Sequence, residues 1–251
     1  MIGKVGNDVF AKNMIENLER FNVYVKGITA ADVQSGVAVI NVFGSDNTII
    51  VDKGANALLS TDDIDRNFDL LSECDAVLMQ FEIPLETVMY VAKKAKELGK
   101  YVIINPAPVQ NIPTELLIST DLLILNEHEA GFLVGLDVTD KNVETAAVQL
   151  LKSGVGEVLI TLGRDGSFYL SRDESCKVPA LKVKTVDTTA AGDTYTAGYI
   201  IGKSNTGSTE SAMRFASAAA AIAVTRLGAS VSVPTKEEVE DILKNGKSSS
   251  V

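Results

Sequence analysis

Histidine and cysteine are scarce in this chain of 251 residues, and their scarcity excludes several kinds of site. His128 is the only histidine, so a histidine-rich metal site is excluded. A Ser-His-Asp triad would have to use this one residue. The two cysteines, Cys74 and Cys176, lie far apart in the sequence and suggest no disulfide framework. A reducing cytoplasm is the simplest setting for such a chain, and we expect a cytoplasmic protein.

Positively charged residues are fewer than negatively charged ones, and long apolar runs are lacking. The chain has 23 Lys and Arg against 33 Asp and Glu, a formal net charge of −10, and a pI near 4.7. This acidic balance argues against nucleic acid and against an anionic membrane as a partner. We find neither an apolar run long enough to span a bilayer nor a basic-then-apolar leader. A phosphorylated substrate is still compatible with these counts, because a local anion site can lie in an acidic protein.

Strands and helices alternate along most of the chain. The predicted strands lie at 1–6, 23–28, 75–80, 101–105, 122–125 and 157–161, and the predicted helices include 85–98, 127–134 and 143–153. This order predicts an α/β fold, a three-layer sandwich whose mostly parallel central sheet is covered on both faces. Residues 36–42 and 48–51 flank a turn and predict a hairpin. The later segments 166–170, 177–179 and 181–186 are typical of antiparallel strands at a sheet edge. Further helices are expected to begin at Ala191, Thr209 and Lys236.

The stretch 187–194, Asp-Thr-Thr-Ala-Ala-Gly-Asp-Thr, carries the clearest functional pattern. It follows the extended run 181–186, and it precedes a segment poor in strand formers, which predicts a strand, a small-residue turn and a helix start. Thr188 or Thr189 can cap that helix, and free N–H groups with the helix dipole make an anion site. If the anion is a phosphate being transferred, Asp193 in the first turn suits a general base that takes a proton from an alcohol. Simple helix capping is the alternative interpretation.

Two further patterns place polar groups at the ends of predicted strands. Asn126 and Glu129 lie three residues apart on one helix face, where they could position a nucleotide phosphate and hydrated Mg²⁺; the alternative is an ordinary acidic helix N-terminus. Glu82 ends a strand at the edge where open α/β sheets bind ligands; the alternative is a cap for the next helix.

Two glycine-containing segments need separate interpretations. The segment 161–166 (Thr-Leu-Gly-Arg-Asp-Gly) joins two strands through glycines that permit a tight turn and a close backbone approach. The segment 198–204 is not a P-loop, because it has one residue too few between its glycines and lies inside a predicted helix. Residues 218–224 predict a small-residue helix in the core.

Together these motifs resemble the phosphofructokinase-B/ribokinase family of sugar kinases. The stretch 187–194 is similar to the family signature Asp-Thr-Thr-(Gly/Ala)-Ala-Gly-Asp-Thr-(Phe/Tyr). The other matches follow in family order over nearly the whole chain, at 79–82, 105–108, 126–129, 161–163, 218–225 and 232–234. The resemblance implies ATP-dependent phosphorylation of D-ribose at its 5-hydroxyl. Another sugar, a nucleoside, or a non-catalytic nucleotide-binding remnant are the alternatives.

The resemblance also implies roles for individual residues. Asp193 would deprotonate the acceptor hydroxyl, Glu82 would contact the sugar, and Glu129 would hold Mg²⁺ through water. The implied ATP-binding residues are Asn126, Thr161, Leu162, Gly163, Arg164, Asp165, Gly166, Gly192, Asp193 and Ser217. The implied K⁺ site consists mostly of backbone oxygens at Asp187, Thr189, Ala223, Arg226, Gly228 and Ser232. Ser217 stands where relatives often have His or Asn and cannot stack on a base, and Ala190 stands where many have Gly.

At the level of the whole chain, the resemblance implies one kinase domain over residues 1–244. The hairpin at about 36–52 would form part of a β lid through which relatives dimerise, and residues 245–251 are expected to be a disordered tail. The family normally has a first strand with a sugar-holding aspartate and a Gly-Gly-x-Gly-x-Asn signature before the strand at 1–6. We therefore expect a truncated product or gene model; the alternative is a departure that has lost much of its sugar contact. ATP and D-ribose are the implied partners.

Overall fold

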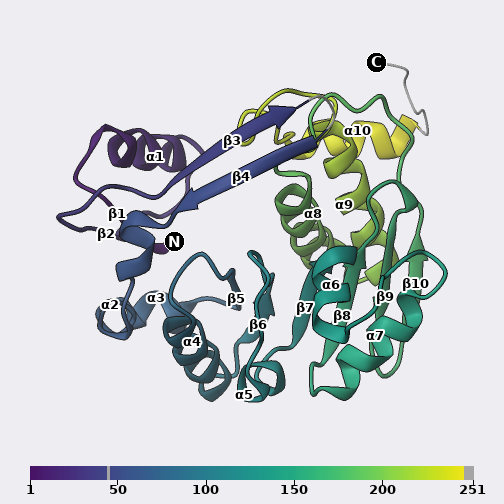
Figure 1. Ribbon diagram of the computed structural model, residues 1–251, viewed down its shortest axis with the longest axis horizontal. Coiled ribbons are helices and arrows are strands. Elements are labelled where there is room, and N and C mark those ends of the chain that lie inside the picture. Colours follow the sequence, from purple (N-terminus) through teal and green to yellow (C-terminus); the bar gives the residue numbers. More distant parts are fainter. Residues whose placement is uncertain (44–45, 246–251) are drawn as a thin grey trace. The chain divides into compact units, whose positions relative to one another are not determined.

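The structure is a computed structural model that describes residues 1–43 and 46–245, and it divides into two compact units, Met1–Pro108 and Val109–Val251 (Figure 1). The predicted single domain over 1–244 stays a prediction, and the tail predicted at 245–251 lies, except for residue 245, outside the described residues. Among the helices of the described part, none combines the length and the apolar character that crossing a membrane requires.

The first unit contains two parallel strand pairs and one hairpin. Its strands are β1 (Ile2–Val5), β2 (Gly27–Ala30), β3 (Val37–Phe43), β4 (Asp46–Asp52), β5 (Ala76–Met79) and β6 (Tyr101–Ile104). Its helices are α1 (Val9–Arg20), η1 (Gly54–Leu58), α2 (Thr61–Arg66), α3 (Phe68–Glu73) and α4 (Leu85–Glu97). Strands β1 and β2 pair in parallel, as do β5 and β6, and β3 with β4 forms the predicted antiparallel hairpin.

The strand predicted at 23–28 is wrong in its bounds, because the structure places β2 at Gly27–Ala30. The backbone before Gly27 closes the end of α1 instead of pairing. The N–H of Val23 donates to the carbonyl of Leu18, and the N–H of Ile28 donates to that of Val25.

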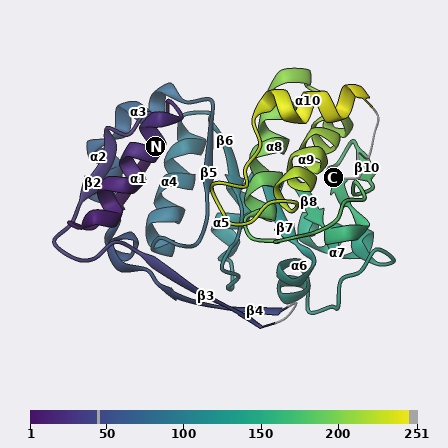
Figure 2. The same ribbon diagram turned by 90° about the horizontal axis from the view of Figure 1, so that it is seen from above.

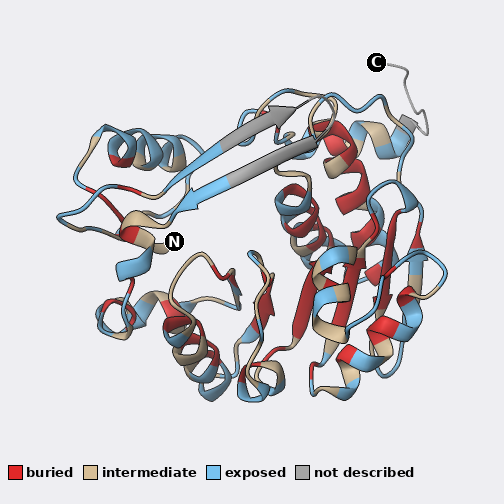
Figure 3. Ribbon diagram, viewed as in Figure 1, coloured by how far each residue is buried: buried red, intermediate tan, exposed pale blue. Residues whose placement is uncertain are grey.

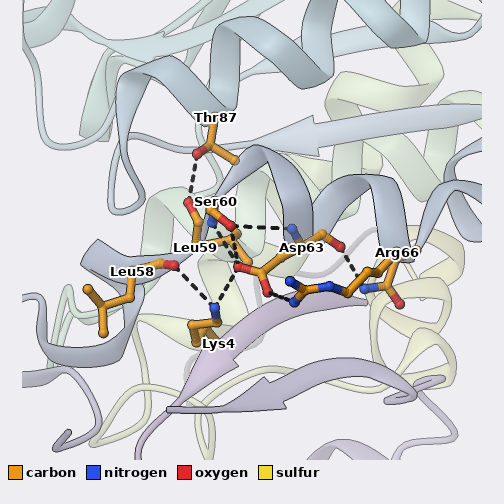
Figure 4. Close-up of polar contacts among 8 residues, drawn as sticks. Lys4, Leu58, Leu59, Ser60, Asp63, Arg66 and Thr87 are labelled. Atoms are coloured by element: carbon orange, nitrogen blue, oxygen red, sulfur yellow. Dashed lines mark hydrogen bonds and ion pairs between the residues drawn. The ribbon is translucent and has the colours of Figure 1, made fainter. Parts of the chain in front are cut away.

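A buried polar network ties β1 to the short helices of the first unit (Figure 4). Asp63 has only 2% of its side chain exposed, and its Oδ2 lies 2.6 Å from Nζ of Lys4 on β1. The same carboxylate accepts hydrogen bonds from the backbone N–H and the hydroxyl of Ser60, the N-cap of α2. Lys4 also donates to the carbonyl of Leu58, and Thr87 on α4 donates to that of Leu59. Asp63 and Lys4 therefore join a strand to a helix cap and to Leu58, next to the residue whose carbonyl accepts from α4.

The second unit has four strands covered by helices on both faces. Its strands are β7 (Leu122–Asn126), β8 (Glu157–Thr161), β9 (Ser167–Leu170) and β10 (Ser175–Val178). Its helices are α5 (Thr114–Ile118), α6 (Glu127–Val134), α7 (Val143–Lys152), η2 (Gly163–Asp165), α8 (Ala191–Thr206), α9 (Thr209–Ala223) and α10 (Lys236–Asn245). Strand β7 is parallel to β8, whereas β8–β9 and β9–β10 are antiparallel. Helices α8 and α9 lie on one face and α6 and α7 on the other (Figure 2). The strands between them are largely buried (Figure 3).

The predicted strand at 181–186 is wrong: no strand is assigned to these residues, which are described in full. The segment pairs with none of the strands that the structure describes. Its end is attached to a helix, because the N–H of Val186 donates to the carbonyl of Val224 at 2.7 Å. Leu181, Lys182 and Thr185 are exposed, as an unpaired connection would be.

Helices α8 and α9 pack closely through small residues, and this packing explains the glycines at 198 and 202. A Cβ at Gly198 would lie 2.9 Å from Cα of Ala216, and one at Gly202 would lie 2.8 Å from Cα of Ala212. Both glycines lie inside α8, so the structure confirms that 198–204 is not a P-loop. The predicted small-residue core helix is also confirmed, because Ala218, Ala219, Ala221 and Ala223 are buried in α9.

Candidate active site

The N-terminus of α8 is open, without a side-chain cap. The N-cap residue is Ala190, whose φ of 59° and ψ of 13° lie in the left-handed region, and it makes no side-chain capping hydrogen bond. The predicted cap from Thr188 or Thr189 is therefore wrong, since the Thr189 hydroxyl donates to Asp187 at 2.6 Å instead. Among the described residues we find no hydrogen-bond partner for the N–H groups of Gly192 and Asp193. Two donors at a helix N-terminus are thus available to an anion.

Replacing Ala190 by glycine is expected to stabilise the protein. A left-handed conformation costs a non-glycine residue about 1–2 kcal/mol, and the extra freedom of glycine in the unfolded chain returns about 0.4–1 kcal/mol of that. The free energy of unfolding should therefore rise by about 0.5–1 kcal/mol, measured by urea denaturation. Ala191→Gly is the matched control and should destabilise, because residue 191 is the first helical residue of α8 and glycine loses more backbone freedom there on folding. A loss of stability in Ala190→Gly would show that the left-handed conformation is not strained.

A cavity of about 780 Å³ opens beside this helix N-terminus, and all of its walls belong to the second unit. One wall is the turn after β8, with Thr161, Gly163 and Gly166, and another is the start of α8, with Ala191 and Gly192. The remaining lining residues are Arg164, Asp165, Ala180, Leu181, Lys182, Val183, Thr185, Thr188, Tyr195, Ser217, Ala220, Ala221 and Val224. Seven of the predicted ATP-binding residues thus surround one cavity, whereas Asn126, Leu162 and Asp193 are not among its lining residues.

The turn between β8 and β9 is compact enough to bring its backbone against the cavity. The N–H of Leu162 donates to the carbonyl of Gly166 at 2.8 Å, and the side chain of Leu162 is buried rather than directed into the cavity. Gly166 has a φ of 101°, and a Cβ there would lie 2.1 Å from the carbonyl oxygen of Val178. Only glycine fits such a position, so the turn chemistry predicted for 161–166 has a steric cause.

Asn126 and Glu129 form a reciprocal capping box at the start of α6. Oδ1 of Asn126 accepts from the N–H of Glu129 at 2.8 Å, and Oε2 of Glu129 accepts from the N–H of Asn126 at 2.9 Å. Both interpretations of this pair therefore remain open, because capping is present and does not occupy all the oxygen lone pairs. Burial raises the pKa of the Glu129 carboxyl, and the negative charge of Asp193 raises it further. Asp193 lies in the first turn of α8, as predicted, and its side chain is exposed, as is that of His128.

Asp187 joins the loop before α8 to the loop after α9. Its Oδ1 accepts from the N–H of Thr189 at 2.9 Å, and its Oδ2 accepts from the N–H of Gly228 at 2.9 Å. The Thr189 hydroxyl and these two N–H groups hold the pKa of the Asp187 carboxyl below its usual value. Ser232, which is fully buried, donates its hydroxyl to the carbonyl of Ala229 at 2.7 Å. The structure therefore brings Asp187, Thr189 and Gly228 together. The side chain of Arg226 forms an ion pair with Glu238, and its backbone carbonyl, the group expected at the K⁺ site, does not take part in that pair.

Glu82 lies in the first unit, in the loop between β5 and α4. The preceding residue fixes this loop, because the N–H of Phe81 donates to the carbonyl of Ala107 at 2.9 Å and its carbonyl accepts from Nζ of Lys53 at 3.0 Å. The N-cap of α4 is Pro84, and no side chain caps the helix. The alternative interpretation of Glu82 as a helix cap is therefore wrong.

Several residues of the cavity wall are not identified from the sequence. Leu181, Lys182, Val183 and Thr185 line the cavity, although the alternating pattern was interpreted as an edge strand. Tyr195 also lines the cavity, and no role is assigned to it from the sequence. The length of segment 181–186 could have identified it as part of the cavity wall. Its six residues lead directly into the stretch 187–194, so they must cross the space beside the start of α8.

Comparisons with known proteins show the family to which this chain belongs. The pfkB family of carbohydrate kinases matches residues 1–236. A deoxyribokinase from Salmonella typhi is 36% identical over 249 residues, which cover 97% of this chain and 81% of the relative. The crystal structure of a ribokinase from Thermotoga maritima has 39% identity and a TM-score of 0.87 over 97% of this chain and 80% of that one. A ribokinase from Arabidopsis thaliana, solved with ribose and ATP, has 32% identity and a TM-score of 0.87 over 97% and 81% of the two chains.

The chain belongs to the pfkB family of carbohydrate kinases. It is a kinase of the ribokinase type, and the predicted family is confirmed. The predicted fold class is confirmed as well, since these relatives share an α/β fold with a mostly parallel central sheet.

Proposed function

We propose that this kinase transfers the γ-phosphoryl group of ATP to the 5-hydroxyl of D-ribose. One observation carries the proposal: an exposed carboxylate, Asp193, lies in the first turn of a helix in which the N–H groups of Gly192 and Asp193 have no partner among the described residues, beside a large cavity. Free N–H groups bind the charged phosphate, and a carboxylate at their side can accept the proton of an attacking hydroxyl. A nucleotide in the cavity would present its terminal phosphate to both.

Each wall of the cavity has a part in this reaction. Ala220, Ala221 and Val224 offer an apolar surface to the base, and the glycines of the turn after β8 allow the backbone to approach the nucleotide closely. The N–H groups of Gly192 and Asp193 would stabilise the charge on the transferred phosphoryl group. Asp193 would hold the acceptor hydroxyl in line and take its proton, and Glu82 would bind a sugar hydroxyl.

Asn126 and Glu129 are suited to hold Mg²⁺ through its water shell. The charges of Glu129 and Asp193 act on each other, and a divalent cation near both would relieve the repulsion that helps to raise the pKa of Glu129. Carboxylate and amide oxygens are hard ligands of the kind Mg²⁺ prefers. When bound, the ion supplies positive charge to the phosphate oxygens.

A monovalent cation, K⁺, fits the loops that Asp187 joins. The carboxylate of Asp187 already accepts three hydrogen bonds, so its main contribution is to hold the two loops together. Backbone oxygens of Ala223, Arg226, Gly228 and Ser232, with the hydroxyl of Thr189, would supply the other hard ligands. When bound, K⁺ supplies positive charge beside the loop that leads into Ala190 and Gly192. That loop sets the position of the phosphate-binding N–H groups.

The sugar acceptor is tested by initial rates of ADP release with Mg-ATP and K⁺. D-Ribose should give the highest kcat/KM, and replacing K⁺ by Na⁺ should lower the rate. The second candidate acceptor is 2-deoxy-D-ribose, because a relative at 36% identity is a deoxyribokinase. A higher kcat/KM for 2-deoxy-D-ribose would overturn the choice of ribose. ATP binding without transfer to either pentose, to other sugars or to nucleosides would contradict the proposed kinase reaction.

A further inference from the structure

Two buried hydroxyls form a hydrogen bond beside the cavity. Tyr195 on α8 is 6% exposed, and its hydroxyl donates to Oγ of Ser167 at 2.7 Å. Ser167, the first residue of β9, has no exposed surface. This is the hydrogen bond that a buried tyrosine is expected to form. The hydrogen bond joins Tyr195 of helix α8 to Ser167 of strand β9, which are 28 residues apart in the sequence.

Tyr195 lies near the start of α8, where the proposed reaction takes place, and Ser167 lies next to the turn 161–166, where the nucleotide would bind. Tyr195 lines the cavity itself and follows Asp193 by two residues in the same helix. Ser167 directly follows Gly166, the last residue of the turn after β8, and pairs across the sheet with Thr161, the first residue of that turn. The hydrogen bond therefore links the helix of the free N–H groups with the base of the turn against which the nucleotide would lie.

The link is rigid at its strand end. Ser167 pairs with Thr161 on one side and with Val178 on the other, so it is held inside the sheet. Gly166 has no room even for a Cβ. A shift of the helix start relative to the turn would have to break the hydrogen bond or distort this strand.

We propose that the Tyr195–Ser167 hydrogen bond is a positioning device that sets the width of the nucleotide cavity by fixing the start of α8 against the turn after β8. Tyr195 acts through the helix and not on the transferred group. The proposal rests on the proposed function only in taking this cavity to be the nucleotide site.

The same helix supplies a matched control. Tyr199 lies one turn after Tyr195 and is 2% exposed. Its hydroxyl has no hydrogen-bond partner among the residues that the structure describes. Tyr199→Phe therefore makes the same chemical change in the same helix without removing a hydrogen bond.

The test is the affinity for a non-hydrolysable ATP analogue with Mg²⁺, measured by titration calorimetry. Tyr195→Phe, Ser167→Ala and the double variant should each raise Kd by about tenfold, because either single change removes the one hydrogen bond. Tyr199→Phe should leave Kd within about twofold of the wild-type value, since it removes no hydrogen bond. Urea denaturation of each variant ensures that only folded protein is titrated, and a purely structural role would change the unfolding midpoint but not Kd.

Three results would overturn the proposal. The first is a wild-type Kd in Tyr195→Phe. The second is a Kd of the double variant raised by about a hundredfold, which would show that the two single changes act independently. The third is a rise of Kd in Tyr199→Phe equal to that in Tyr195→Phe. The proposed function fails separately, by absence of phosphoryl transfer in a chain that binds the analogue. A wild-type chain that does not bind the analogue would contradict both.

Discussion

Replacing Asp193 by asparagine is expected to lower kcat by about 10²- to 10⁴-fold, the usual contribution of a general base. Asparagine keeps the size of the side chain but cannot accept the proton of the sugar hydroxyl. Binding of Mg-ATP should persist, because the N–H groups at the start of α8 belong to the backbone. Steady-state ADP release measures the first effect, and calorimetric titration with a non-hydrolysable ATP analogue measures the second.

Asp173→Asn is the matched control for the change of charge. Asp173 is exposed in the turn between β9 and β10, and it is not among the residues that line the cavity. Its kcat should equal that of the wild type. If Asp193→Asn kept more than a tenth of the wild-type kcat, Asp193 would not be the general base.

The second large effect is expected on stability, from Asp63→Asn in the first unit. The change leaves the ammonium group of Lys4, which is 14% exposed, without its charged partner. Removing one member of a buried ion pair costs about 3–5 kcal/mol, and we expect the free energy of unfolding to fall by that amount. Urea denaturation measures the loss.

Two neighbouring changes separate the buried pair from ordinary surface charge. Arg66 also contacts Asp63, at 3.2 Å, but 68% of its side chain is exposed, so Arg66→Ala should cost no more than about 1 kcal/mol. Asp62 is exposed beside Asp63 in the same helix, and Asp62→Asn should have a small effect. Equal losses in Asp62→Asn and Asp63→Asn would show that burial of the pair is irrelevant.

The contribution of Asp63 should also appear in the pH dependence of the free energy of unfolding. Burial of Asp63 raises the pKa of its carboxyl, but hydrogen bonds from Lys4 and Ser60 outweigh this and leave the pKa below its usual value. The folded state therefore binds fewer protons than the unfolded state as the pH falls. The stabilisation is complete above the unfolded pKa, about 3.9, and is lost as the pH falls through the lower folded value. Asp63→Asn should flatten this part of the acid denaturation curve.

The sequence was sufficient where local chemistry decides the structure. Helix α6 begins and ends at the predicted residues, because Asn126 and Glu129 cap its start and Gly135, with a φ of 68°, ends it. Strand β8 also has the predicted bounds, as an apolar run between a glycine and a turn. In the site, local sequence patterns also predict Asp193 in the first turn of α8 and a turn at 161–166 between two strands.

The sequence was insufficient where distant contacts decide. Alternation at 181–186 indicated a strand, but the neighbouring strand needed for pairing is absent from the described part of the unit, and the segment lines the cavity instead. The capping role assigned to Thr189 failed because Asp187 takes its hydroxyl. The short helices α2 and α3 were not predicted, although Ser60 and Asp63 form a capping box, because their apolar pattern is too short to show a period. The link from Tyr195 to Ser167 could not be predicted from one sequence.

The most direct test of the proposed kinase reaction is the product that the wild-type chain forms from Mg-ATP and D-ribose in the presence of K⁺, followed by phosphorus NMR. We predict the resonance of a phosphomonoester on the 5-hydroxyl of ribose, formed in equal amount with ADP. The signal should not form at a comparable rate in Asp193→Asn. A chain that binds Mg-ATP but releases ADP with inorganic phosphate, or transfers no phosphate to the sugar, would contradict the proposed transfer to ribose.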